Sequence, residues 1–412
     1  MPTSKQVIPN QLPITAIEWR KCAKEKNIER VSIHDEESFE KGFDSASVIS
    51  FHQYLLLRAI YPDTQDPKKI YDRRYRRTWI EASSFDTAVR CLDTQQAWKL
   101  YLKSVKLKRK TQASAKSLGI FSLVRYYQLE VVKIDGQDSS SMLPKIDISP
   151  PSPQTQQQQQ QPVTPTRPHH IGHRIFSRLS LESPAEPSPA TSTPERPENL
   201  SPHIPENDKA SNDRVVCDEQ IVNMALLLYL NALTLSCTRT LGDWTAHRKA
   251  FILKSQGKKL YEARVDGYFR SPHNKVEAIL EVKRYDRSLN TAKIKMQETA
   301  QMAAWIGSDP PDVRVMRKRG TKCSRLLVSQ DRHEIYVTIA KFDADYVDYI
   351  CGNLSKTKSF LKMQDYGPFR VDDVKYISAL GYLLLAFMVD QGEKRLGGVE
   401  GETDESDEDW QG

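Results

Sequence analysis

Three charged residues, Asp266, Glu281 and Lys283, have the types and the spacing that metal-dependent phosphodiester hydrolysis requires. Asp266 follows an apolar run that ends at Val265, and Glu281 and Lys283 close a second run that begins at Ala278. Two carboxylates repel each other at close range unless a cation lies between them, and Mg²⁺ takes oxygen ligands and keeps several waters. A divalent ion makes its bound water more acidic, and a lysine stabilises negative charge on a phosphate. These residues therefore predict a hydrolytic site with Mg²⁺ or Mn²⁺ as its cofactor.

Two neighbouring strands must bring these side chains together. The segments 260–269 and 276–283 have the composition of strands, with a polar turn between them. Because side chains alternate along a strand, Glu281 and Lys283 point to the same face. If the two strands pair around the turn, Asp266 lies close to Glu281. Gly267 then leaves space for a backbone or a ligand to approach.

The surrounding segments predict a mixed α/β layer fold. A helix is expected from about 219 to 235, where apolar residues recur at helical spacing, and Asn290 begins a second helix that ends near Gly307. Further expected elements are a strand over 249–253, a hairpin of 325–329 and 334–339, and a late apolar helix over about 371–389. The order is helix, three strands, helix and then more strands, which is typical of layered α/β domains.

Residues 213–390 resemble the PD-(D/E)XK nuclease superfamily, in particular the nuclease-like domains that are widespread in fungal genomes. The resemblance rests on the segments Asp218–Asn223, Val265–Gly267, Glu281–Lys283, Gln297–Ile306 and Asp365–Phe369. It implies a four-stranded mixed sheet flanked by helices, a restriction-endonuclease-like core of order α-β-β-β-α-β. Val265 stands where many members of the superfamily have proline.

The resemblance also implies roles for individual residues. Asp266 and Glu281 would be metal ligands and Lys283 the catalytic lysine. Glu219 matches an acidic residue that the first helix often offers to the metal site. Gln297 or Gln301 matches a glutamine that some branches carry on the helix after the third strand. These two glutamines lie four positions apart on one helical face, so the sequence does not choose between them.

Each of these residues also has a structural interpretation. Glu219 is placed to stabilise a helix N-terminus through the helix dipole. Glu281 and Lys283 can form an ion pair on an exposed strand. Gln297 and Gln301 can be ordinary exposed helix residues. Because the superfamily contains members that no longer cut, two hypotheses remain: a metal-dependent nuclease that hydrolyses DNA phosphodiester bonds, and a catalytically inactive nucleic-acid-binding or interaction module of the same fold.

The chain divides into five regions by composition. They are a flexible N-terminus (1–29), a mainly helical basic region (30–136), a disordered Pro/Gln/Ser-rich linker (137–212), the nuclease-like domain (213–392) and an acidic disordered tail (393–412). The linker follows from its composition, because 13 of the 23 prolines lie between Pro150 and Pro205 and such a segment buries too little apolar surface to fold.

The basic region carries mixed signals. Two short segments, 51–58 and 97–102, have apolar faces at helical spacing, while 120–132 is rich in aromatic and β-branched residues and could be a strand. Two basic clusters stand out: 73–79 combines arginines with aromatic residues, and 103–110 is rich in lysine. Such clusters can grip phosphates and stack on bases, can act as nuclear-import signals, or can form a solvated helix face.

Net charge, cysteines and hydropathy restrict the remaining possibilities. The formal charge is +7, and seven acids lie between Glu400 and Asp409. Without those seven, the chain has 60 basic and 46 acidic residues, a balance that suits a polyanion such as DNA as partner.

The six cysteines are scattered singly, which predicts no zinc site and no disulfide framework. The apolar stretch 221–235 is too short to span a bilayer comfortably and the first residues lack a signal-peptide pattern. We therefore expect an intracellular protein, nuclear and without membrane contact.

Overall fold

The computed structural model describes residue 9 and residues 11–35, 43–107, 118–133 and 219–399. The expected linker (137–212), residues 400–412 of the expected acidic tail and part of the second basic cluster lie outside the described residues. The expected start of the disordered tail at residue 393 was wrong, because residues 393–399 continue the helix Val374–Val399. The described residues of the basic region (30–136) and of the segment 213–392, which composition separates, belong to one compact unit.

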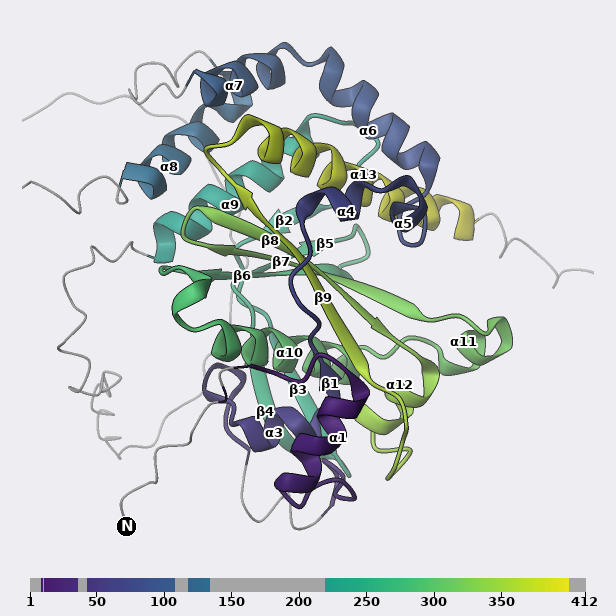
Figure 1. Ribbon diagram of the computed structural model, residues 1–412. Coiled ribbons are helices and arrows are strands. Elements are labelled where there is room, and N and C mark those ends of the chain that lie inside the picture. Colours follow the sequence, from purple (N-terminus) through teal and green to yellow (C-terminus); the bar gives the residue numbers. More distant parts are fainter. Residues whose placement is uncertain (1–8, 10, 36–42, 108–117, 134–218, 400–412) are drawn as a thin grey trace, which may run out of the picture. The chain divides into compact units, whose positions relative to one another are not determined.

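A seven-stranded mixed sheet forms the centre of this unit (Figure 1). Its strands, in spatial order, are β1 (Ala59–Ile60), β9 (Leu361–Arg370), β8 (Glu334–Phe342), β7 (Cys323–Asp331), β6 (Val276–Lys283), β5 (Gly267–Arg270) and β2 (Asp243–Thr245). The pairs β1–β9 and β6–β7 are parallel, and the other neighbours are antiparallel. A separate two-stranded sheet pairs β3 (Ala250–Ser255) with β4 (Lys258–Arg264).

Helices cover both faces of the large sheet. The first part of the chain contributes α1 (Ala16–Glu25), α3 (Phe51–Leu56), α4 (Pro67–Tyr71), α5 (Arg73–Arg76), α6 (Ala82–Thr94), α7 (Gln96–Lys106) and α8 (Ser122–Lys133). The second part contributes α9 (Glu219–Leu235), α10 (Thr291–Ser308), α11 (Val313–Arg319), α12 (Ala344–Ile350) and α13 (Val374–Val399). Short 3-10 helices are η1 (Ala46–Val48), η3 (Gly119–Phe121) and η5 (Arg287–Leu289).

The sheet separates two hydrophobic cores. Helices α6, α7, α8, α9 and α13 pack on one face, above the sheet in Figure 1, whereas α1, α3, α10, α12 and the β3–β4 hairpin pack on the other. Strand β6 serves both cores: Leu280 and Val282 belong to the first, and Ile279 belongs to the second. Glu281 and Lys283 alternate with Leu280 and Val282, so they lie on the α10 face, as the alternation of a strand predicts.

Local sequence explains where several helices begin. Ser50 and Gln53 form a capping box at α3, in which each side chain accepts a hydrogen bond from the backbone amide of the other residue. Asn290 precedes α10, and Glu219 lies in the first turn of α9. Helix α10 is buried from Ile294 to Ile306, because the sheet, α3, α12 and the small hairpin surround it. A helix so enclosed can place polar side chains where water does not reach them.

Three local expectations were wrong. The segment 120–132 forms helix α8, because Val124, Gln128 and Val131 recur at helical spacing and face α9, which outweighs β-branched composition. The expected strand 260–269 is two strands in different sheets, interrupted at Asp266. The segment assigned to a flexible N-terminus contains α1, since buried Trp19 anchors it to the backbone carbonyl of Leu55.

The sheet has seven strands rather than the four expected from the resemblance. The additional strands include β1, a two-residue strand of the N-terminal region, and β2, a three-residue strand. Short strands leave little periodicity in a sequence, so neither was visible as a pattern. The expected helices over 219–235 and after Asn290, and the hairpin now seen as β7–β8, are confirmed.

Helix α13 is long and apolar. Its segment Val374–Lys394 passes a test of length and composition for crossing a membrane, but 61% of the window is buried inside the protein. Residues such as Leu380, Leu384 and Phe387 pack in the core that α6 and α9 share. The apolar composition is therefore accounted for by packing within this unit.

Candidate active site

Strand pairing brings Asp266 beside Glu281. Strands β5 and β6 are antiparallel with Gly267 opposite Leu280, and the amide of Asp266 donates to the Leu280 carbonyl at 3.0 Å. The carboxylate of Asp266 turns toward β6 and accepts a hydrogen bond from the Val282 amide at 3.1 Å. The spatial relation expected from the sequence is therefore present.

Gly267 makes this close approach possible. A Cβ atom at Gly267 would lie 2.6 Å from the Thr245 carbonyl oxygen and 3.0 Å from Leu280 Cδ1. Such contacts would force β2 and β5 apart. The space beside Asp266 is thus occupied by the backbone of a neighbouring strand, which is one of the two uses expected for this glycine.

Glu281 is the centre of the cluster, and its side chain is held on both oxygens. The residue is 2% exposed. Gln297 Nε2 donates to Oε1 at 2.5 Å, and Gln301 Nε2 donates to Oε2 at 2.5 Å. Lys283 Nζ also donates to Oε1. Both glutamines contact the carboxylate, because residues four apart on α10 share one face, so the choice left open by the sequence does not arise.

Lys283 lies at the rim of the cluster. Its side chain is 13% exposed, and its Nζ is 4.0 Å from Glu219 Oε1, which is 42% exposed. Burial by itself lowers the pKa of Lys283, but the carboxylates of Glu281, Glu219 and Asp266 outweigh it, so the pKa is raised and the ammonium stays charged. Glu219 is therefore linked to the site by its interaction with Lys283.

Arg248 is a member of the site that sequence reasoning missed. Its Nη2 donates to Asp266 Oδ1 at 2.9 Å, although 61% of the arginine side chain is exposed. The residue lies between β2 and β3, eighteen positions before Asp266, and nothing in its local sequence signals the contact. It adds a solvent-facing cation to the rim.

The pKa of Glu281 is raised to about 7. Burial is the main cause, and the nearby carboxylate of Asp266 raises it further, while Lys283 and Gln301 act in the opposite direction. A buried carboxylate beside a second carboxylate carries its negative charge at a cost. A cation placed between the two acids would remove that cost.

The donor set fits a hard divalent cation with few protein ligands. Asp266 and Glu281 supply carboxylate oxygens, and the buried Oε1 of Gln301 has no hydrogen-bond partner. Among the described residues, no group of three or more His, Cys, Asp or Glu side chains is arranged to hold a metal. Two carboxylates with water and substrate oxygens are a usual arrangement for Mg²⁺. Asp266 and Glu281 are the carboxylates that could serve as ligands of such an ion.

A second polar cluster lies beside the first on the same face of the sheet. Its centre is Arg287 on η5, which is 4% exposed. Arg287 contacts three buried carboxylates, with Nε 2.5 Å from Asp331 Oδ2, Nη2 2.5 Å from Glu298 Oε1 and Nη1 3.4 Å from Asp365 Oδ2. Lys283 and Asp331 are register partners on β6 and β7, so the two clusters are adjacent.

The Arg287 cluster also ties the N-terminal region to the sheet. Tyr61 donates to Glu298 Oε2 at 2.7 Å, and Thr64 donates to Asp365 Oδ2 at 2.9 Å. Lys295 Nζ lies 3.4 Å from the same oxygen of Asp365. Sequence reasoning gave none of these residues a role, because charged residues are normally exposed and Tyr61 lies more than 200 positions from its partners.

The residues expected at the site are therefore found together. Asp266, Lys283, Gln297 and Gln301 surround Glu281, and Glu219 lies next to Lys283. The sequence signal was the Glu-x-Lys spacing on one strand and the two glutamines on one helical face. Comparisons of the chain with protein-family models, with curated proteins and with solved structures found no match in any of the three.

Proposed function

We propose that this protein is a metal-dependent nuclease that hydrolyses phosphodiester bonds in DNA. The observation that carries the proposal is the convergence of Lys283, Gln297 and Gln301 on the buried carboxylate of Glu281, with Asp266 near enough to raise the pKa of that carboxyl. These residues come from three separate elements of the fold. A structural ion pair would need only two residues. The combination of two carboxylates and one ammonium matches the needs of phosphodiester hydrolysis.

Each side chain has a definable task. Asp266 and Glu281 would hold Mg²⁺ or Mn²⁺, which when bound would supply a Lewis acid and a more acidic water. Lys283, held at the rim by Glu281, would donate to the attacking water or to a phosphate oxygen as negative charge develops there. Gln297 and Gln301 would fix the orientation of the Glu281 carboxylate.

Arg248 would act at the entrance. Its guanidinium is largely exposed while one amino group is bound to Asp266. An exposed arginine attracts phosphate groups through charge-assisted hydrogen bonds. A phosphate that took over the guanidinium would release Asp266 Oδ1 for the cation.

The fold around the site supports the same interpretation. Strands β5, β6, β7 and β8 are contiguous in the sheet, with α9 on one face and α10 on the other. We propose that these elements are a restriction-endonuclease-like core, extended by β9, β1 and β2 into the larger sheet.

One observation favours a second candidate function, a nucleic-acid-binding module without cleavage. Every carboxylate oxygen of Asp266 and Glu281 already accepts a hydrogen bond from a protein donor. A site closed in this way could be a stable ion-pair cluster that needs no metal. Binding of DNA without hydrolysis would follow from the basic surface alone.

A cleavage assay distinguishes the two. Purified full-length protein is incubated with plasmid DNA and with single-stranded DNA in Mg²⁺, in Mn²⁺ and in EDTA. The nuclease proposal expects cleavage in the metal-containing reactions only, and its loss in Asp266→Asn. Binding in a gel-shift assay together with intact DNA under all conditions would support the module instead and overturn the nuclease proposal.

A further inference from the structure

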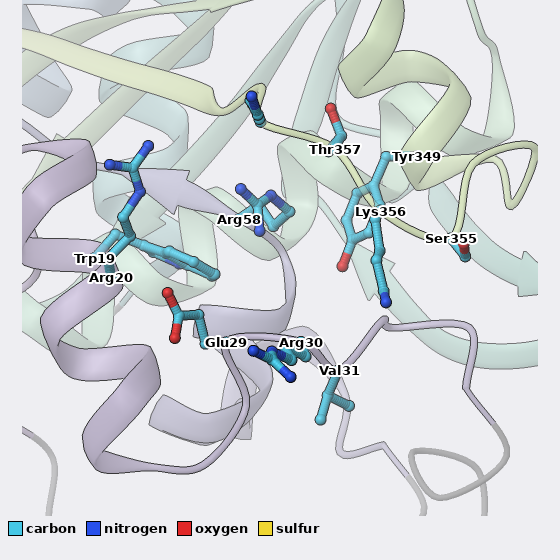
Figure 2. A pocket seen from close by; sticks show the side chains of 11 residues that line it. Trp19, Arg20, Glu29, Arg30, Val31, Arg58, Tyr349, Ser355, Lys356 and Thr357 are labelled. Atoms are coloured by element: carbon cyan, nitrogen blue, oxygen red, sulfur yellow. The ribbon is translucent and has the colours of Figure 1, made fainter.

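A basic cavity lies on the α1 and α12 side of the molecule (Figure 2). Its volume is about 360 Å³. Trp19 and Arg20 come from α1, Tyr349 comes from α12, and the rest of the lining comes from loops. It shares no lining residue with the Glu281 cluster, so it is a separate feature.

Five cations line this cavity against one carboxylate. The cations are Arg20, Arg30, Arg58, Lys356 and Lys358, and the carboxylate is Glu29. Among the residues that the structure describes, none of these five cations forms an ion pair with a carboxylate. Clustered cations of one sign repel one another, so this arrangement is relieved by an anion.

Arg58 is at the centre of the arrangement, as Figure 2 shows. Its guanidinium lies 4.4 Å from the ring centre of Trp19 and 4.7 Å from that of Phe360, which hold it flat. Its Nε donates to the Ser359 carbonyl at 3.2 Å. Burial lowers the pKa of Arg58, Tyr349 and Tyr346 partly offset this, and the neighbouring charge of Arg20 lowers it further. The terminal amino groups remain as donors toward the cavity.

The backbone at Arg58 makes this placement costly. Arg58 follows Leu57, the C-cap residue of α3, and has φ of 50°, in the left-handed region. Glycine is the usual residue at this position after a helix. A residue with a Cβ atom loses about 1 kcal/mol of conformational free energy in this backbone conformation relative to glycine.

The cavity chemistry selects phosphate groups. Trp19 and Tyr349 are buried, so their faces are not open to stack on a nucleobase. The remaining donors are guanidinium, ammonium and the hydroxyls of Ser355 and Thr357. Arginine and lysine together with hydroxyls form the charge-assisted hydrogen bonds that phosphate oxygens accept.

We propose that this cavity is a binding site for a multiply charged phosphate ligand. The same chemistry would accept the backbone phosphates of a nucleic acid strand or a free oligophosphate compound. The proposal is independent of hydrolysis at Glu281, because it concerns binding at a different surface and its test measures no cleavage.

Calorimetric titration of the full-length protein with tripolyphosphate, and separately with a single-stranded oligothymidylate, tests the site in EDTA. The variant Lys356→Ala/Lys358→Ala removes two exposed lining cations. The control variant Lys254→Ala/Lys258→Ala removes two exposed cations from the β3–β4 hairpin. It therefore has the same net charge as the cavity variant. We expect tripolyphosphate affinity to fall about tenfold or more in the cavity variant and to stay unchanged in the hairpin variant.

Arg58→Gly probes the centre without straining the fold. Glycine suits the left-handed backbone of Arg58, so the variant removes the guanidinium while relieving strain. Gln256→Gly, at φ of 48° in the β3–β4 turn, is the matched backbone control. Thermal unfolding of both variants shows whether the fold persists. We expect binding to be lost in Arg58→Gly and kept in Gln256→Gly.

The outcomes separate the sources of phosphate. Loss of both tripolyphosphate and oligothymidylate binding in the cavity variants supports the site and identifies nucleic acid backbone as a ligand. Loss of tripolyphosphate binding alone supports the site and identifies a free oligophosphate. No saturable tripolyphosphate binding by the wild-type protein, or equal losses in the cavity and hairpin variants, would overturn the proposal.

Discussion

The two polar clusters on the α10 face of the sheet use similar residues but differ in access to solvent. The Arg287 cluster is sealed: its arginine and three carboxylates are almost completely buried, and it is closed by Tyr61 and Thr64. The Glu281 cluster has an equally buried centre, but its outer members Lys283, Glu219 and Arg248 reach solvent. A sealed network can only stabilise, whereas an open one can meet a substrate.

The difference follows from position along the strands. Asp331 and Ser329 on β7 lie inside the sheet, with β8 and β9 beyond them. Glu281 and Lys283 lie on β6, and the neighbouring strand β5 begins only at Gly267, so Asp266 lies in the connection before it. The same face of one sheet thus holds a closed network at its centre and an open one toward a short strand.

The largest effect is expected when the sealed cluster is broken. Arg287→Met leaves three buried carboxylates without their shared cation, which costs about 3–5 kcal/mol of unfolding free energy. Urea denaturation followed by circular dichroism measures it. Arg317→Met is the control, because that arginine is half exposed in its pairs with Asp345 and Asp348 and its loss should change stability much less. Equal losses of unfolding free energy in the two variants would contradict a special structural role of the buried Arg287 cluster.

Next in size is the loss of Lys283 from the open cluster. Lys283→Met should reduce DNA cleavage about 10²–10³-fold, because it removes the cation that meets developing charge, while the circular dichroism spectrum stays unchanged. Initial rates on plasmid DNA with Mg²⁺ measure the effect. Lys318→Met, on the exposed face of α11, is the matched control and should cut normally. If Lys283→Met cleaved DNA at the wild-type rate, Lys283 would not be part of the catalytic site.

A third prediction concerns pH. The pKa of Glu281 is raised from 4.5 to about 7, chiefly by burial, with Asp266 adding to the shift and Lys283 opposing it. The folded state therefore binds this proton more tightly than the unfolded chain, and stability falls as pH rises from about 4.5 to about 7. The loss is at most about 3 kcal/mol for this group.

Glu281→Gln should remove that part of the pH dependence. Unfolding free energies of wild type and variant are measured in EDTA across the window, and that of the wild type should fall relative to that of the variant as pH rises toward 7. Asp331, with a pKa raised by burial to about 6, contributes to both proteins and cancels in the comparison. Parallel curves for the two proteins would show that Glu281 is ionised throughout the window.

The smallest effect is expected at the exposed rim. Arg248→Ala breaks an ion pair with Asp266 that is largely exposed on the arginine side, so stability should change by less than about 1 kcal/mol. The same change frees Asp266 Oδ1, and Mg²⁺ affinity measured by calorimetry should rise. A lower or unchanged Mg²⁺ affinity in Arg248→Ala would count against Asp266 as a ligand.

Several parts of this arrangement could be predicted from the sequence because they depend on local periodicity. Alternation along β6 put Glu281 and Lys283 on one face, and helical spacing on α10 put Gln297 and Gln301 together. The pairing of two strands across a short turn brought Asp266 within reach. Neighbours in sequence constrain one another strongly, so these relations survive in the folded protein.

Other parts could not be predicted, because their partners are distant in sequence. Arg248 shows no local signal for Asp266, and the segment of Tyr61 and Thr64 reaches Glu298 and Asp365 from the other side of the linker. Helix α8 was misread because its β-branched and aromatic residues suit a strand, and only packing against α9 decides for a helix.

The amino-acid sequence by itself determined which side chains share a face of a strand or helix, since backbone geometry repeats every two residues in one and every 3.6 in the other. Tertiary structure decided which of those faces are buried, which acids share a cation and which stay open to solvent. Burial and long-range pairing depend on how distant segments pack, and no local pattern encodes that. Glu281 illustrates both: its face follows from its strand, and its raised pKa follows only from the elements packed around it.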